Sequence, residues 1–142
     1  MIEVKFYDEV EDSLLKFAVI ISKYDGKWVF CKHKERDTYE VPGGHREAGE
    51  NILDTAKREL NEETCASEFD ISQVGVYSVT DVEKNIETFG MLYFADIKTF
   101  EGELQSEIEK IIITETLPTA WTYPLIQPKL MEYAAERGFV II

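Results

Sequence analysis

Three glutamates that stand close together in the sequence, Glu59, Glu62 and Glu63, have the residue type and spacing for metal chemistry. On a helical wheel at about 100° per residue, the second and third lie within about 60° of the first, so a helix presents all three carboxylates on one arc. Like charges at this spacing repel each other. Mg²⁺ or Mn²⁺ would offset the repulsion, because both prefer carboxylates, water and phosphates as ligands. The alternative is a solvated acidic face on a surface helix, the commoner explanation for an isolated E-x-x-E-E.

The residues around these glutamates favour the metal-binding alternative. Residues 42–66 read PGGHREAGENILDTAKRELNEETCA. This segment resembles the box of the Nudix hydrolase family, G-x5-E-x7-R-E-U-x-E-E-x-G-U, where U is a bulky apolar residue. Gly44 opens the match, Glu50 and Arg58 fill the next fixed positions, and Ala66 closes it. Cys65 stands where the family usually has Gly, a residue that normally ends the helix in a conformation that side chains disfavour.

The resemblance implies an α/β (α+β) fold, an α/β/α sandwich around a mixed β-sheet. It also implies Mg²⁺-dependent hydrolysis, with Mn²⁺ possible, of a nucleoside diphosphate linked to another group. Carried over to this sequence, Glu59 and Glu63 would be the principal metal ligands, with Glu62 a further ligand and the carbonyl of Gly43 an additional donor. These four positions are the metal site that we expect.

A supporting ion pair and a general base complete the expected catalytic set. The resemblance implies that Glu50 and Arg58 form a pair, and arginine can hold a carboxylate bidentately. An ordinary ion pair at a helix start would have the same structure. Glu59 is one candidate for the base. The family can also use an acid from a loop outside the box, and here we choose Glu107, just before an expected strand, over the alternative that it is a solvated loop charge.

A cluster of basic residues precedes the box and could hold the substrate phosphates. Lys32, Lys34 and Arg36 stand at the end of an expected strand in a chain that has little other positive charge. Charge complementarity favours phosphate binding, and an ordinary charged strand end is the equal alternative. The lone histidines His33 and His45 are expected to be structural or solvent-exposed.

Only the absence of certain sequence features reduces the number of candidate substrates. Features typical of ADP-ribose, diadenosine-polyphosphate and NADH hydrolases are missing after the box. The chain is therefore most similar to the MutT-like branch, which hydrolyses nucleoside triphosphates, including oxidised ones such as 8-oxo-dGTP, to the monophosphate and pyrophosphate. Trp121 or Tyr123 could stack on a purine, with core packing as the alternative. Nucleotide-sugar, dinucleoside-polyphosphate or ADP-ribose hydrolysis, and nucleotide sensing without catalysis, stay open.

The composition predicts one domain over residues 1–142 with a small-molecule partner. There are 28 Asp and Glu against 15 Lys and Arg, a net charge of −13, which argues against a nucleic-acid duplex or an anionic membrane as partner. Two cysteines make no disulfide framework. With no recognisable signal peptide or membrane span, we expect a cytoplasmic protein. Monomer and homodimer remain open.

Strands and helices at regular intervals are expected to position these residues. The predicted strands are 14–22, 27–34, 74–82, 86–97 and 108–114. The predicted helices are 51–64 and 125–137. In the first, the apolar residues Ile52, Leu53, Ala56 and Leu60 recur at helical spacing, and the last three form a stripe on the helical wheel. Asp25-Gly26 predicts a hairpin turn, and Pro42-Gly43-Gly44 predicts a loop without regular structure. Together these elements suggest helices packed on a mixed sheet.

Overall fold

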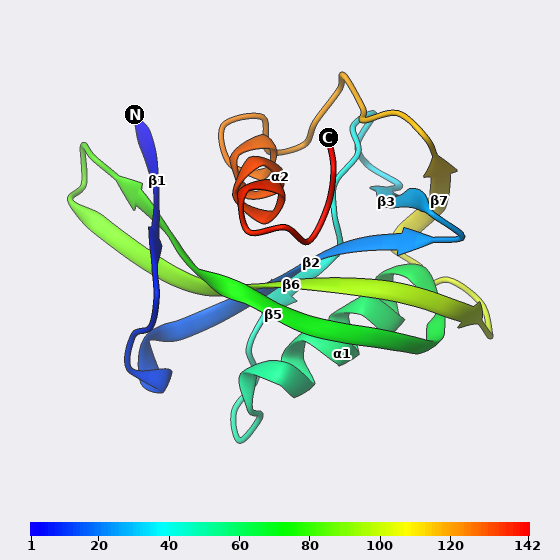
Figure 1. Cartoon of the computed structure of the whole chain (residues 1–142), viewed down its shortest axis with the longest axis horizontal. Helices are drawn as coiled ribbons and strands as arrows, with labels where there is room; N and C mark the ends of the chain where they lie inside the picture. Colours follow the sequence, from blue (N-terminus) through cyan, green and yellow to red (C-terminus); the bar gives the residue numbers. More distant parts are fainter.

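A mixed seven-stranded sheet lies between two helices that cover its opposite faces (Figure 1). The computed structural model describes residues 1–142. The strands are β1 (Ile2–Tyr7), β2 (Leu15–Tyr24), β3 (Lys27–His33), β4 (Gly43–His45), β5 (Ala66–Asp81), β6 (Ile86–Phe100) and β7 (Ile108–Thr114). The helices are α1 (Ile52–Thr64) and α2 (Gln127–Glu136), with a single 3-10 turn at Asp12–Leu14. The predicted sandwich is confirmed. Neither helix has the length and apolar character needed to cross a membrane.

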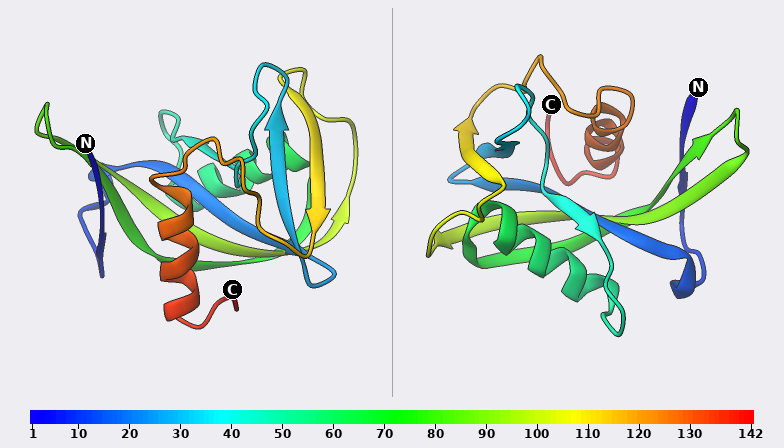
Figure 2. Two further views of the ribbon diagram at one scale, coloured as in Figure 1. Left: turned by 90° about the horizontal axis from the view of Figure 1, so that it is seen from above. Right: turned by 180° about the vertical axis from the view of Figure 1, so that it is seen from behind.

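The sheet forks along one edge of β2. The strand order is β1-β5-β6-β2-β3-β7. Strands β2 and β6 are parallel, and Ile20 of β2 lies opposite Tyr93 of β6. On its other edge, β2 pairs with β4 through residues 17–19 and with β3 through residues 22–24. Figure 2 shows β3 and β7 turned away from the direction of the long strands β2, β5 and β6. Strands β3 and β4 therefore share the same edge of β2 at different positions along it.

Alternation along β2 divides the hydrophobic core into one cluster per face of the sheet. Ala18 and Ile20 pack in a cluster that includes Leu60 of α1. Ile21 faces the opposite side, in a cluster with Leu130 of α2. Successive side chains of a strand point to opposite faces, and burying a side chain such as Leu or Ile stabilises the fold by roughly 1.5–3 kcal/mol. Each helix is thereby fixed to its own face.

Helix α1 ends at the predicted residue and begins one residue later than predicted, with Asn51 as its cap. The side chain of Asn51 accepts a hydrogen bond from the Asp54 N–H at 2.9 Å, which satisfies one of the free amides of the first turn. The predicted apolar stripe is wrong at one position: Leu53 is 38% exposed, while Ile52 and Thr55 are buried. Thr55 tolerates burial because its hydroxyl donates to Glu50 Oε1 at 2.7 Å.

Cys65 ends α1 in the left-handed conformation, with φ 67° and ψ 15°. The turn is therefore the one that glycine would make, at a cost of roughly 1–2 kcal/mol for a residue with a side chain. Two neighbours support it. Asn61 Nδ2 donates to the Ala66 carbonyl at 2.9 Å, and Thr64 Oγ1 accepts from the Ala66 N–H at 3.2 Å.

The sequence-based prediction of a loop at residues 42–44 is wrong, because Gly43–His45 forms β4. A Cβ at Gly43 would lie 2.7 Å from the Ala18 carbonyl oxygen, so only glycine fits this strand against β2. Strand β1 was not predicted, and β5 begins at Ala66, earlier than expected. Both strands depend on partners that are distant in the sequence, since β1 pairs with the end of β5.

Candidate active site

Two glycines of β4 lie directly against two glutamates of α1. The Gly43 N–H donates to Glu63 Oε1 at 2.7 Å. A Cβ at Gly44 would lie 2.5 Å from Glu59 Oε1 and 2.6 Å from Glu59 Oε2. A side chain at Gly44 would therefore displace the Glu59 carboxylate from its present position. Strand β4, which was not predicted from the sequence, therefore forms the wall against which the carboxylates pack.

Arg58 binds three carboxylates of the site, those of Glu50, Glu59 and Glu62. Its Nε lies 2.8 Å from Glu50 Oε2 and its Nη2 3.1 Å from Glu50 Oε1, a bidentate arrangement. Its Nη1 donates to Glu59 Oε1 at 2.8 Å and to Glu62 Oε2 at 3.3 Å. Hydrogen bonds from Arg58 and then from Thr55 lower the pKa of Glu50 to about 2. The structure thus brings together the two residues expected to pair.

Glu63 has no such cationic partner. It is 7% exposed, and its Oε2 lies 3.1 Å from His33 Nε2. Burial raises the pKa of Glu63 to about 8, against the lowering effect of the Gly43 N–H, and the charges of Glu59, Glu40 and Glu107 add to the rise. A carboxyl group in this position stays largely protonated at neutral pH unless a cation binds beside it.

The carboxylates fit a hard divalent cation. Burial raises the pKa of Glu59 as well, although Arg58 opposes the shift and Glu62 adds to it. The positive charge on Arg58 is shared among several acids, so the cluster keeps an excess of negative charge. Oxygen donors carrying such an excess are the ligands that Mg²⁺ and Mn²⁺ prefer. The four predicted ligand positions, Gly43, Glu59, Glu62 and Glu63, surround this β4–α1 contact.

A cavity of about 410 Å³ opens beside Glu63. Its volume is in the range of small-molecule sites. Residues from all strands except β1 and β7, from α1, from the segment between β3 and β4 and from the segment around the start of α2 line it: Phe17, Val19, His33, Arg36, Glu40, Val41, Gly43, Gly44, His45, Glu63, Tyr77, Val79, Thr88, Tyr123, Ile126, Gln127 and Leu130. One wall is acidic and the others are largely apolar, an arrangement suited to a charged group joined to a flat apolar one.

The structure separates the predicted basic cluster. Arg36 lines the cavity, where it binds Glu40 Oε1 at 2.9 Å and lies 5.8 Å from the ring of Tyr123. Lys32 points elsewhere, with its Nζ 3.1 Å from Glu109 Oε1, and Lys34 does not line the cavity. Tyr123, expected to contact a base, is 40% exposed at the cavity.

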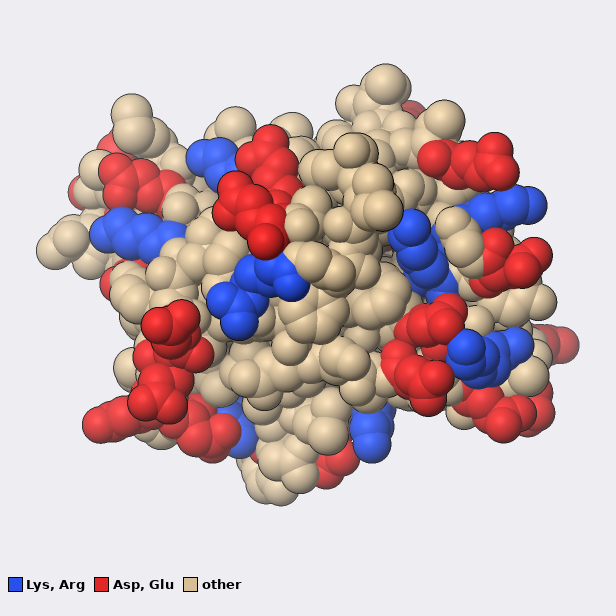
Figure 3. All heavy atoms as spheres, viewed as in Figure 1, with Lys and Arg blue, Asp and Glu red and all other residues tan.

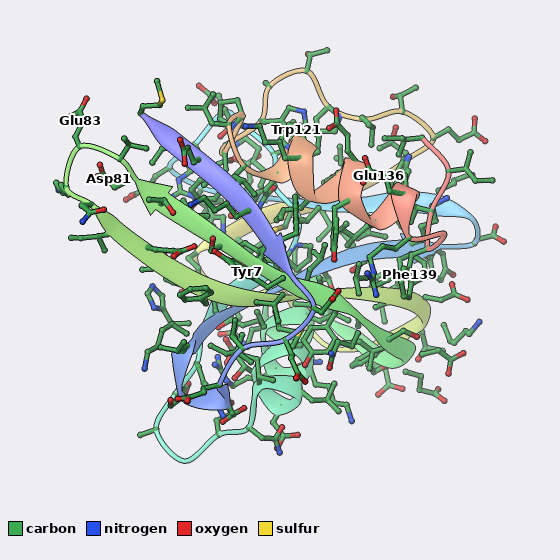
Figure 4. The ribbon with its side chains drawn as sticks, turned by 60° about the vertical axis from the view of Figure 1, so that its left-hand side comes forward. Tyr7, Asp81, Glu83, Trp121, Glu136 and Phe139 are labelled. Atoms are coloured by element: carbon green, nitrogen blue, oxygen red, sulfur yellow. The ribbon has the colours of Figure 1, made fainter.

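Trp121 and Glu107 lie behind or beside the site. The Trp121 ring packs edge-on against Phe30, with centroids 5.5 Å apart, and Figure 4 shows Trp121 by the segment that leads into α2. Its role is therefore core packing, the alternative considered for it. Glu107 accepts the Lys34 N–H through its carbonyl at 2.9 Å. Its carboxylate is near enough to raise the pKa of Glu63.

Sequence reasoning missed several residues of the site. His33 contacts Glu63, and the His45 ring lies 4.4 Å from that of Phe17. Gln127 Oε1 accepts the Val41 N–H at 2.9 Å. A signal existed only for His33, which follows Cys31 by two residues in a strand and so shares its face.

The remaining acidic side chains form no single patch on the face drawn in Figure 3. They lie there in several separate groups, interspersed with Lys and Arg and separated by a broad uncharged area. Asp81 and Glu83 lie at the tip of the β5–β6 hairpin, far from α1 (Figure 4). Most of the net charge is thus surface charge, and the site uses a small part of it.

The sequence and the fold both match proteins of one family. Residues 13–121 match the NUDIX domain. Over 102 residues the chain is 35% identical to YtkD of Bacillus subtilis (strain 168), provisionally named an 8-oxo-dGTP diphosphatase. The match covers 72% of this chain and 63% of YtkD, less than two thirds of that relative.

Solved structures give the same picture. A mutant of the Bacillus subtilis pyrophosphohydrolase BsRppH superposes with a TM-score of 0.80 at 25% identity, over 99% of this chain and 93% of the other. The NUDIX domain of Shewanella oneidensis NrtR, complexed with ADP ribose, superposes with a TM-score of 0.65 at 17% identity, over 87% of each chain. The second likeness is evidence for the fold alone.

Proposed function

The chain belongs to the NUDIX domain family, and from this premise we propose that it hydrolyses a nucleoside diphosphate linked to a further group. We propose a nucleoside triphosphate as that substrate, including oxidised forms such as 8-oxo-dGTP. Water would cleave the phosphoanhydride to give the nucleoside monophosphate and pyrophosphate. We also propose that residues 1–142 form one domain of this family. The two free cysteines suit the reducing cytoplasm.

The observation that carries the proposal is the buried Glu63 beside Glu59 at the edge of the cavity. No Lys or Arg forms an ion pair with Glu63, and burial, with a further contribution from the acids around it, raises its pKa. Glu59, Glu62, Glu63 and the carbonyl of Gly43 would hold Mg²⁺ or Mn²⁺. When bound, the ion would neutralise phosphate oxygens and make a water molecule more acidic.

The residues of the chain would position and deprotonate the attacking water. Arg58 holds Glu59 through Oε1 at 2.8 Å, which leaves Oε2 of Glu59 as the atom that accepts the proton. Glu50 fixes Arg58 from the other side. Glu107 is the alternative base, because its charge reaches Glu63 from the loop before β7. Variants of the two glutamates would distinguish these roles.

On the substrate side, Arg36 is the basic residue that we retain for the phosphates. It lines the cavity, whereas Lys32 is paired with Glu109 and neither Lys32 nor Lys34 contributes to the lining. Tyr123 lies within cation–π distance of Arg36 and would stack on the base.

A substrate panel with matched variants tests the proposal. Purified protein is incubated with Mg²⁺ and (d)NTPs, 8-oxo-dGTP, ADP-ribose, diadenosine polyphosphates or nucleotide sugars, and the phosphate products are identified. We expect monophosphate and pyrophosphate from a triphosphate. We expect Glu63→Gln to lose at least about 100-fold in kcat, since even outer-shell partners of a metal are worth about 10–100-fold. Glu132→Gln, an exposed position on α2, should keep full activity.

Other outcomes would redirect or overturn the assignment. Hydrolysis of ADP-ribose, a nucleotide sugar or a dinucleoside polyphosphate in preference to triphosphates would keep the reaction class and replace the substrate. Tight binding without any hydrolysis would indicate a nucleotide sensor. Full activity in Glu63→Gln would contradict the proposed metal site.

A further inference from the structure

Three side chains of different chemistry converge behind the cavity. Cys31 and His33 come from β3 and Glu63 from α1, and one ligand atom of each lies within 4.8 Å of the others. The alternation of β3 places the thiol and the imidazole on one face. His33 and Glu63 also line the cavity, so the cluster has a route to solvent although Cys31 itself is fully buried.

The donor set differs from that of the glutamate cluster. Thiolate and imidazole ligands select zinc and related borderline cations, whereas Mg²⁺ prefers oxygen alone. Zinc bonds of about 2.0–2.3 Å place its ligand atoms roughly 3.3–3.8 Å apart in a tetrahedron. His33 Nε2 and Glu63 Oε2 are already 3.1 Å apart. A side-chain adjustment of about 1 Å would bring Cys31 Sγ to the same spacing.

The charges also balance for a divalent cation. A Cys31 thiolate and a Glu63 carboxylate supply two negative charges, and a neutral His33 adds none. Glu40 lies 3.7 Å from His33 Nε2, but Arg36 binds Glu40 at 2.9 Å and compensates it. The set is therefore neutral with zinc bound, which is the condition for burying a charged centre at low cost.

We propose that Cys31, His33 and Glu63 form a second cation site that binds Zn²⁺, with the fourth position open to the cavity. Three protein ligands with one open position are typical of accessible zinc sites. Because Glu63 would belong to both sites, Zn²⁺ excludes Mg²⁺ from its ligand. The consequence, that zinc inhibits hydrolysis, rests on the proposed function; zinc binding itself does not.

Cobalt(II) provides a spectroscopic test of binding that needs no activity. Co²⁺ is added to the full chain, with the thiols kept reduced by a phosphine, and the cobalt–thiolate charge-transfer band in the near ultraviolet is recorded. We expect the band in the wild type and in Cys65→Ser, the matched variant of the other cysteine. We expect its loss in Cys31→Ser. Zn²⁺ should displace Co²⁺ and bind Cys31→Ser more weakly than the wild type by more than about 100-fold.

Two results would overturn the proposal. They are no band in the wild type, and a band that persists in Cys31→Ser, whether or not Cys65→Ser keeps it. The melting temperature of each variant without metal shows that it is folded. If the band behaves as expected but no nucleotide is hydrolysed, the zinc site stands and the proposed function fails. If hydrolysis occurs and Zn²⁺ inhibits it equally in the wild type and Cys31→Ser, the inhibitory site is elsewhere.

Discussion

The carboxyl groups at the two ends of α1 have opposite environments, and their pKa values shift in opposite directions. At the N-terminal end, Arg58 forms a bidentate pair with Glu50 and lowers the pKa of that carboxyl to about 2. At the C-terminal end, burial raises the pKa of Glu63 to about 8, and only a backbone amide and His33 contact it. The first arrangement is complete in the protein alone. The Glu63 carboxylate needs a proton or a bound cation to balance its charge, and this end of α1 is therefore the place for a ligand.

Substitution of Arg58 should have the largest effect on stability. It leaves the carboxylates near the N-terminal end of α1 without a cationic partner, as Glu63 already is at the other end. Arg58→Met leaves Glu50 and Glu59 without their cationic partner. We expect the free energy of unfolding at pH 7 without metal to fall by roughly 3–4 kcal/mol, near the lower end of values for broken buried pairs, because Arg58 is partly exposed. Urea denaturation measures it. Lys57→Met, an exposed neighbour, is the control, and equal losses in both variants would contradict the special role of Arg58.

The pH dependence of stability sharpens the contrast at the other end. The pKa of Glu63 rises from 4.5 to about 8 on folding, so the unfolded chain releases this proton first as the pH rises. Its contribution to stability is complete below about pH 4.5 and is lost as the pH approaches 8. We expect a loss of roughly 3 kcal/mol over that interval, with about 1.4 kcal/mol per pKa unit reduced by solvent relaxation. Denaturation of metal-free Glu63→Gln should show a flatter profile, while a wild-type slope in that variant would exclude Glu63 as the cause.

Binding of Mg²⁺ near Glu63, at the C-terminal end of α1, should stabilise the protein. At pH 8 and a Mg²⁺ concentration of about 100 Kd, binding to the native state stabilises it by about 2.7 kcal/mol, a rise in melting temperature of roughly 5–10 °C for a chain of this size. Thermal unfolding with and without Mg²⁺ measures the shift. We expect Glu63→Gln to lose most of it and Glu132→Gln to keep it. A full shift in both variants would place the bound ion elsewhere.

The smallest effect is expected from Glu50→Gln, at the complete end. The pKa of Glu50 is lowered on folding, so its contribution is present above about pH 4.5 and is lost as the pH falls toward 2. The variant should be slightly less stable at neutral pH and should lose less stability on acidification than the wild type. Acid titration followed by circular dichroism measures both slopes, and parallel acid limbs would show that the pair contributes nothing.

Local signals in the sequence predicted much of the structure. Asp25-Gly26 forms the predicted hairpin turn, with φ of 51° and 75°. The predicted bounds of β7 are those observed, and α1 differs by its capping residue alone. These elements depend on neighbours in the chain, through turn chemistry, capping and periodicity.

The missed parts depend on residues that are distant in sequence. Strand β4 exists because Gly43 and Gly44 fit between β2 and α1, and no local pattern states this. The cavity joins residues from Phe17 to Leu130, which is why Gln127 and His33 were not recognised. Lys32 was predicted beside Arg36 from its sequence position. Lys32 lies within β3, whereas Arg36 lies beyond the end of that strand, and the two side chains have different surroundings.

The parallel pairing of β2 with β6 has a consequence for the order in which the chain assembles during synthesis. Ile20 pairs with Tyr93, so one edge of β2 stays open until β6 has left the ribosome. By then α1 and its glutamates have already emerged, and domains of this size generally fold as units. Strands β6 and β7, which emerge last, carry none of the proposed metal ligands. Translation therefore delivers the proposed ligands before the parallel pair at the centre of the sheet can form.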